Sequence, residues 1–191
     1  NTGMYCGQLE FSAQSKQKVT FTSQWTGMGG SVSTTALDAS PDAQTTGQVM
    51  AANANVGRLA EGGSRLASPN WAMEFRVSVN NNLRTIESID ETSPVAVREG
   101  ECTVTGTVNT YFGSKDMVEK FQNGTITSFN SRTAKNNQAI ILQIPRATLR
   151  GGGNPQVSGK NTDVQVSFEF SGSYDSETGA SIIFDRVEYF Y

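Results

Sequence analysis

Residues 73–80 read Met-Glu-Phe-Arg-Val-Ser-Val-Asn, with an apolar side chain at every second position. The polar side chains occupy the positions between them: Glu74, Arg76, Ser78 and Asn80. Because successive side chains of a strand point to opposite faces, a period of two predicts a half-buried β-strand. One face of this strand packs on a core, and the other meets water or a polar partner.

The same alternation recurs along the chain, at residues 8–13, 19–25, 102–108 and 164–170. Residues 140–142 and 182–184 are continuously apolar instead, which is typical of strands covered on both faces. The pattern predicts a mainly β chain, an antiparallel β-sandwich or barrel, in one domain over residues 1–191. The expected strands lie near 17–26, 72–82, 101–112, 125–132 and 138–149.

One short helix is expected at residues 115–123. Ser114 is placed to cap its start, Asp116 lies in its first turn, and Gly124 follows as the left-handed residue that ends a helix. Met117, Val118 and Phe121 share one apolar stripe, which predicts that the helix packs on a sheet.

Residues 27–69 break the alternation and are rich in Gly, Ser, Thr and Ala. A loop of this length is uncommon inside a compact domain. Its apolar residues are too frequent for a linker, so we expect an arm that orders against another subunit; a disordered insertion is the alternative. The apolar residues of this expected arm are Val32, Leu37, Val49, Met50, Val56, Leu59 and Leu66.

The composition argues against an enzyme. The 191 residues contain no histidine, which excludes Ser-His and Cys-His nucleophiles and imidazole metal sites within the chain. Charged residues make up 17% of the chain and the formal net charge is −3, so the composition does not indicate a basic surface that binds nucleic acid. We expect no catalytic residue, no cofactor and no metal.

The local sequence motifs indicate no phosphate-binding, catalytic or membrane-spanning segment. Lys160 follows Ser158-Gly159, but the residue after it is Asn161 and the first glycine of a phosphate loop is missing. The acidic pairs Asp90-Glu91 and Asp175-Glu177 lie in turn-like stretches, where solvated carboxylates are expected. No apolar run approaches the roughly 20 residues that span a membrane.

The two cysteines, Cys6 and Cys102, fit no metal motif. A disulfide between them is the alternative, but their spacing alone does not support one, and we expect two buried free thiols. The chain starts at Asn1 without a methionine, so we expect an N-terminal portion to precede it.

A colinear series of short motifs resembles the major tail tube proteins of long-tailed double-stranded DNA phages, which are similar to type VI secretion tube proteins. The series covers nearly the whole chain and comprises Gly3-Met4, Phe11-Ser12-Ala13, residues 33–41, Val56-Gly57, residues 80–84, residues 104–107, Tyr111-Phe112, residues 121–125, Ile144-Pro145-Arg146 and residues 158–164.

The resemblance implies a β-sandwich with one flanking helix. Six such subunits close a ring by joining strands into an inner β-barrel, rings stack into a hollow tube, and the long loop between two lumen strands reaches the next ring. Closure into a ring also removes the exposed edges of an open sheet.

A conduit for DNA should not hold DNA, because each neutralised phosphate adds affinity. We therefore expect a hydroxyl-rich, weakly charged strand face to line the bore, with Lys18 and Arg76 as departures that can pair with an acidic neighbour such as Glu74. A solvated sheet exterior is the alternative. The expected lumen residues are Lys18, Thr20, Thr22, Gln24, Glu74, Arg76, Ser78 and Asn80.

The resemblance implies a structural virion protein of the phage tail, assembled in the host cytoplasm. The implied partners are further copies of the chain, the tape measure, tail tip and terminator proteins, and double-stranded DNA in passage without specific binding; no membrane is implied. The rival is a monomeric β-sandwich that binds carbohydrate or a cell surface through exposed aromatic rings. Its candidate rings are Trp25, Trp71, Tyr174, Tyr189 and Tyr191.

Overall fold

The computed structural model describes residues 3–35, 38–43, 49–157 and 159–188. In these residues every pairing between strands is antiparallel, as the alternation predicts. The strand order is β2-β1-β5-β8-β11-β10-β9-β3-β4, with β12 beside β10 and β6-β7 as a separate hairpin. Because the order ends at β2 and at β4, the sheet of one subunit is not a closed barrel.

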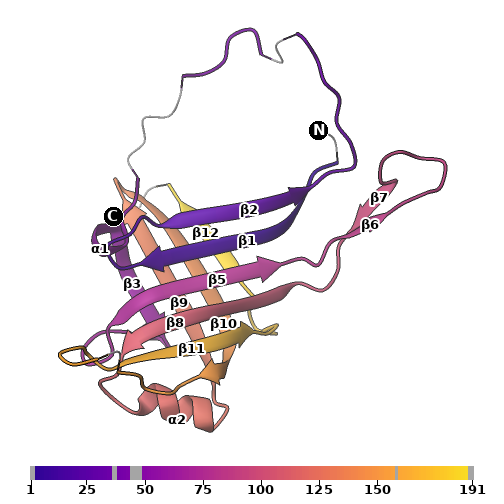
Figure 1. Cartoon of the computed structure of the whole chain (residues 1–191). Helices are drawn as coiled ribbons and strands as arrows, with labels where there is room; N and C mark the ends of the chain where they lie inside the picture. Colours follow the sequence, from indigo (N-terminus) through magenta and orange to yellow (C-terminus); the bar gives the residue numbers. More distant parts are fainter. Residues whose placement is uncertain (1–2, 36–37, 44–48, 158, 189–191) are drawn as a thin grey trace.

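The strands form two layers that cross in Figure 1. The first layer contains β2 (Thr20–Thr26), β1 (Tyr5–Gln14), β5 (Ala72–Asn80), β8 (Thr103–Tyr111) and β11 (Gln165–Gly172). The second layer contains β12 (Ile183–Val187), β10 (Gln138–Gly152), β9 (Ile126–Lys135), β3 (Val56–Glu61) and β4 (Ser64–Arg65).

The long strand β10 joins the two layers. Its first part pairs with β12 and β9, and its last residues pair with β11. Pro145 lies at the register shift between Ile144 and Ala147, where a residue without an N–H is tolerated. The bulge lets one strand serve both layers.

Phenylalanine rings fill the space between the layers. Phe75 on β5 and Phe170 on β11 stack with centroids 5.9 Å apart, and Phe129 on β9 lies 4.5 Å from Phe170. All three are almost completely buried. Gly106 on β8 permits this packing, because a Cβ there would lie 2.3 Å from the Phe170 ring.

Helix α2 (Asp116–Gln122) covers one end of the sandwich (Figure 1). Met117 is buried, and Val118 and Phe121 pack against the core. At its C-terminus Gly124 has φ +60°, and the N–H groups of Gly124 and Thr125 donate to the carbonyls of Phe121 and Lys120. The expected cap at its start is wrong: the capping residue is Lys115, which makes no side-chain cap bond. The Ser114 hydroxyl instead donates to Asp116 Oδ2 and accepts from Asn70 Nδ2.

The segment that the sequence assigned to an arm is only partly an arm. After α1 (Ala52–Asn55), strand β3 pairs with β9, so that the long excursion seen above β2 in Figure 1 is confined to the segment between β2 and α1, of which the structure describes residues 27–35, 38–43 and 49–51. Leu59 is buried, and Val56 and Leu66 pack against the subunit's own core, which corrects their assignment to the arm.

Of the remaining predicted arm residues, Val32 and Val49 are exposed and Met50 is half-buried. Leu37 lies outside the described residues. The loop therefore offers apolar side chains that the described part of the subunit does not cover.

The β6-β7 hairpin was not expected from the sequence. Strands β6 (Arg84–Ile86) and β7 (Ala96–Arg98) project beyond the end of β5 (Figure 1).

Both cysteines have free thiols, as we expected from the sequence. Cys6 is half-buried and Cys102 is exposed, so the expectation of burial is wrong for Cys102. Among the described residues no helix is long and apolar enough to cross a membrane.

Candidate functional site

The candidate site is the polar face of the five-stranded layer, which we call the ladder face. Strand β1 connects the two strands on which lumen residues were expected. Ser12 lies opposite both Thr20 and Arg76, and Glu10 lies opposite both Thr22 and Ser78. Residues directly opposite in an antiparallel pair share a face. The structure therefore brings the predicted residues of β2 and β5 onto one surface.

Lys18 is the exception among the predicted residues. It precedes β2 and forms an isolated bridge with Ala51 at the base of the arm. Gln24 and Asn80, in contrast, both pair with Gln8 and extend the ladder face to the far end of the layer.

The ladder face is wider than predicted. Ser78 lies opposite Thr105 on β8, which in turn lies opposite Ser171 on β11. Sequence reasoning noted these alternating strands but did not join them to the expected lumen residues, because strand order is not visible in the sequence. The additional members are Gln8, Glu10, Ser12, Gln14, Thr103, Thr105, Thr107, Asn109, Gln165, Ser167, Glu169 and Ser171.

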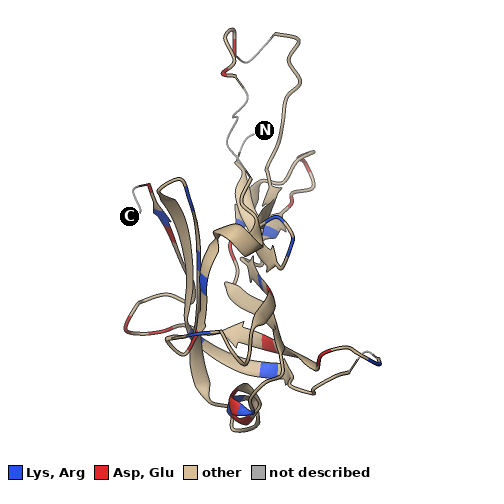
Figure 2. Cartoon of the chain, turned by 90° about the vertical axis from the view of Figure 1, so that its left-hand side faces the viewer, with Lys and Arg blue, Asp and Glu red and all other residues tan. Residues whose placement is uncertain are grey.

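Charges on the ladder face are few and partly cancel. Arg76 forms an ion pair with Glu74, the neighbour that the sequence suggested, and Asn109 Nδ2 donates to Glu74 Oε2 at 2.6 Å. Glu10 accepts a hydrogen bond from Gln8 Nε2 at 2.8 Å. Glu169 is the remaining charged member, and Figure 2 shows how sparse charged residues are along the strands. The face is neutral to slightly acidic.

The middle of the ladder face is hollowed. A depression of about 650 Å³ is lined by the β1, β5, β8 and β11 side chains of this face and by Arg150 at the end of β10. Gly106 contributes to its floor. The surface is therefore a shallow concave sheet with hydroxyl and amide groups.

The ladder face ends at a strand with one neighbour. Among the described residues, strand β2 pairs with β1 on one side only, so its other edge carries backbone N–H and C=O groups without a strand partner there. On the reverse of β2, Phe21 is 42% and Trp25 is 55% exposed. An uncovered edge beside exposed aromatic rings is typical of a surface that another chain covers.

The candidate aromatic rings that the structure describes do not gather into a carbohydrate platform. Trp25 lies opposite Cys6 near one end of the first layer, whereas Trp71 precedes Ala72 at the other end. Tyr174 is exposed in the loop after β11, and Tyr189 and Tyr191 lie outside the described residues.

The comparisons with known proteins agree with this geometry. The family model described as phage tail tube protein matches residues 2–172, which is most of the chain. None of the curated proteins compared with the chain is similar enough to count as a match. With its antiparallel sandwich and helix α2 at one end of it, the chain belongs to the phage tail tube protein family.

Proposed function

We propose that copies of this chain join through the free edge of β2 into hexameric rings, and that the rings stack into the hollow tube that conducts phage DNA into the host. The observation that carries the proposal is a weakly charged ladder face that runs across five strands and ends at an unpaired edge. The number six follows the resemblance to other tail tube subunits.

The ladder face suits the inside of a DNA conduit. Double-stranded DNA carries about one negative charge per 1.7 Å of its axis, and cationic contacts would hold it. Arg76, the one cation on the ladder strands, is already paired with Glu74, and Arg150, which lines the hollow from β10, is outnumbered there by Glu10 and Glu169, which repel phosphate. The hydroxyl and amide groups of the ladder face bind water and add no positive charge that would hold the DNA.

Ring closure accounts for the exposed features of β2. Pairing with a strand of the neighbouring copy satisfies its free backbone groups. The same contact covers Phe21 and Trp25, which the described part of the subunit leaves half exposed.

The arm supports stacking. The arm begins after β2 at one end of the layer, and its last residue, Ala51, bridges Lys18 just before α1 at the opposite end. Val32 and Val49 are exposed on it, and an adjacent ring is the surface that would cover them. The other partners are those of a tail: the tape measure, tip and terminator proteins, assembled with the tube in the host cytoplasm.

The experiment compares the wild type with an arm variant by negative-stain microscopy. Residues 32–48 are replaced by a ten-residue Gly-Ser linker, which spans about 33 Å and so bridges the roughly 23 Å length of β2. The linker spares Val49, whose carbonyl accepts from Lys135 Nζ at 2.9 Å. We expect tubes from the wild type and single rings from the variant; a strictly monomeric wild type at high concentration contradicts the proposal.

A further inference from the structure

A small cleft opens between the two layers, at the end of the first layer where β1 finishes and β5 begins. It holds about 220 Å³, and the side chains of Leu59, Leu66 and Phe75 contribute its apolar lining. This is below the roughly 300–1,000 Å³ of small-molecule sites. Its size suits one protruding side chain.

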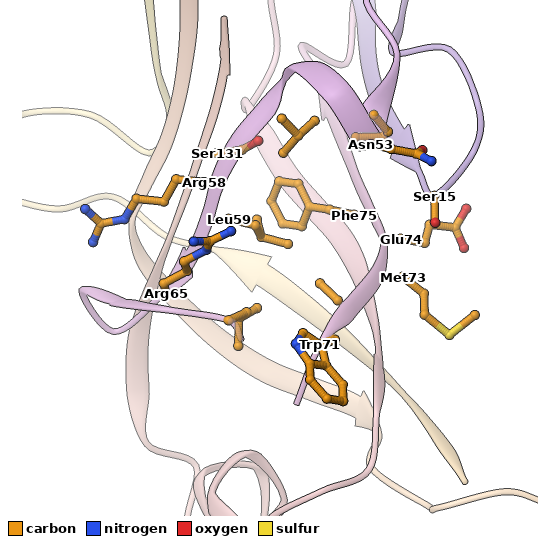
Figure 3. Close-up of a pocket in the computed structure, with 15 residues that line it drawn as sticks. Ser15, Asn53, Arg58, Leu59, Arg65, Trp71, Met73, Glu74, Phe75 and Ser131 are labelled. Atoms are coloured by element: carbon orange, nitrogen blue, oxygen red, sulfur yellow. The ribbon is translucent and has the colours of Figure 1, made fainter. Parts of the chain in front are cut away.

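The mouth of the cleft is cationic and aromatic. Arg58 and Arg65 lie on one side of the cleft in Figure 3, and Trp71, 55% exposed, also lines it. Neither arginine belongs to the ion pairs found among the described residues; Arg58 Nη2 donates to the Gly63 carbonyl at 2.7 Å. The nearby Glu74 is already paired with Arg76. Tryptophan and arginine are the side chains most enriched where interfaces bind tightly.

The β6-β7 hairpin carries the complementary groups. Ile89 at its tip is fully exposed, and Glu87, Asp90 and Glu91 surround it in sequence. Residues 85–97 contain neither lysine nor arginine. The Ser88 hydroxyl donates to Asp90 and lowers the pKa of that carboxyl below its ordinary value, which keeps it charged.

The hairpin is held firmly at its base. The Asn81 N–H donates to the Gly7 carbonyl at 2.9 Å, and Asn81 Nδ2 donates to the Cys6 carbonyl at 3.0 Å. The Gly100 N–H donates to the Asn81 carbonyl at 2.9 Å and so joins the two ends of the hairpin. The tip therefore projects from a defined position on β1.

The cleft and the hairpin lie at opposite ends of the same layer. The cleft includes Ala13 and Ala72, at the end of β1 and the start of β5, whereas the hairpin follows Asn80 at the end of β5. A contact between two different surfaces of identical chains repeats head to tail and builds a stack.

We propose that the acidic β6-β7 hairpin of one copy docks in this cleft of a second copy in the adjacent ring, with Ile89 in the apolar cleft and its carboxylates against Arg58 and Arg65. The inference rests on the proposed stacking of rings and names the surfaces that make it.

Charge exchange tests the docking. Variant H carries Glu87→Lys and Glu91→Lys, variant C carries Arg58→Glu and Arg65→Glu, and variant HC carries all four, which leaves the formal net charge at −3. We expect H or C alone to form rings without tubes, and HC, or an equal mixture of H and C, to form tubes again. Tubes from the mixture of H and C would also show that both of these variants fold.

Two further variants sharpen the readout. Ile89→Ser should raise the protein concentration needed for tubes about tenfold, since it removes one buried aliphatic side chain. A control, Lys160→Glu with Arg186→Glu, changes the net charge as C does but leaves the cleft intact, and should still form tubes.

The outcomes separate this inference from the proposed function. Tubes from H and C alone, or loss of tubes in C that HC does not restore, would overturn the docking while ring formation still supports the tube. The second result would mean that the cleft receives another segment, such as the arm. A wild type without rings would instead overturn the proposed function itself.

Discussion

Removing the charge of Lys120 should destabilise the folded subunit strongly. Lys120 on α2 donates to both carboxylate oxygens of Glu61 on β3, at 2.7 and 2.8 Å, and Thr127 Oγ1 donates to the same carboxylate. Glu61 is only 6% exposed, whereas the Lys120 side chain is 34% exposed. The pair ties β3 to the helix and to β9.

The magnitude follows from this geometry. Breaking a buried ion pair by deleting one partner costs about 3–5 kcal/mol, because the other charge stays buried. Water reaches Lys120 and compensates part of this, so we expect Lys120→Met to lower the free energy of unfolding by about 2–3 kcal/mol. Adding Glu61→Gln removes the stranded charge and should return stability to within about 1 kcal/mol of the wild type.

Urea unfolding of subunits followed by circular dichroism measures these differences. The control is Lys115→Met on the same helix, which breaks the exposed pair with Glu119 and should cost less than about 0.5 kcal/mol. Equal losses for Lys115→Met and Lys120→Met, or additive losses in the Lys120→Met and Glu61→Gln double variant, would refute the reasoning that β3 and α2 are joined through a buried pair.

Three further predictions concern packing, pH and the bore. Gly106→Ala should lower the midpoint of thermal unfolding markedly, because the new methyl group would collide with Phe170; an unchanged midpoint would contradict the packing. The hydrogen bonds of the Thr178 N–H and hydroxyl lower the pKa of Asp175, so the turn they close should be fully stable above the ordinary value of 3.8 and loosen as the pH falls through the lowered pKa; the Thr178 amide signal should follow this change in an NMR titration and lose it in Asp175→Asn. Ser78→Lys should leave tubes intact but give them salt-sensitive affinity for DNA in a filter-binding assay, and tubes that bind DNA no better than the wild type would count against a lumen position.

Local sequence patterns predicted most of the strands. Alternation at Phe75 and Val77 placed β5 correctly, and Gly124 marked the end of α2 because only a left-handed residue completes the hydrogen bonds there. These features depend on residues near one another in the chain, which is why a single sequence reveals them.

Strand β3 escaped prediction for physical reasons. A register shift between Val56 and Arg58 breaks its alternation, and Leu59, Ala60 and Glu61 are buried in succession. From the sequence alone a glutamate such as Glu61 is expected at the surface. Its burial depends on the ion pair with Lys120, which lies far along the chain. The short strands β6 and β7 offered too few residues for any period to show.

The extent of the ladder face could not be predicted because it depends on strand order. Alternation showed that Thr105 and Ser171 lie on polar faces, but only the pairing of β8 with β5 and β11 places them beside Ser78. The same holds for the cleft, whose arginines come from β3 and β4 and whose Trp71 precedes β5.

A cryo-electron microscopy map of the wild-type tube would show which face of the subunit lines the bore. We expect the ladder face there, with Ser78 and Thr107 toward the axis and Phe75 directed into the subunit core. A tube whose outer surface carries Ser78 and Thr107, with another face around the bore, would contradict it.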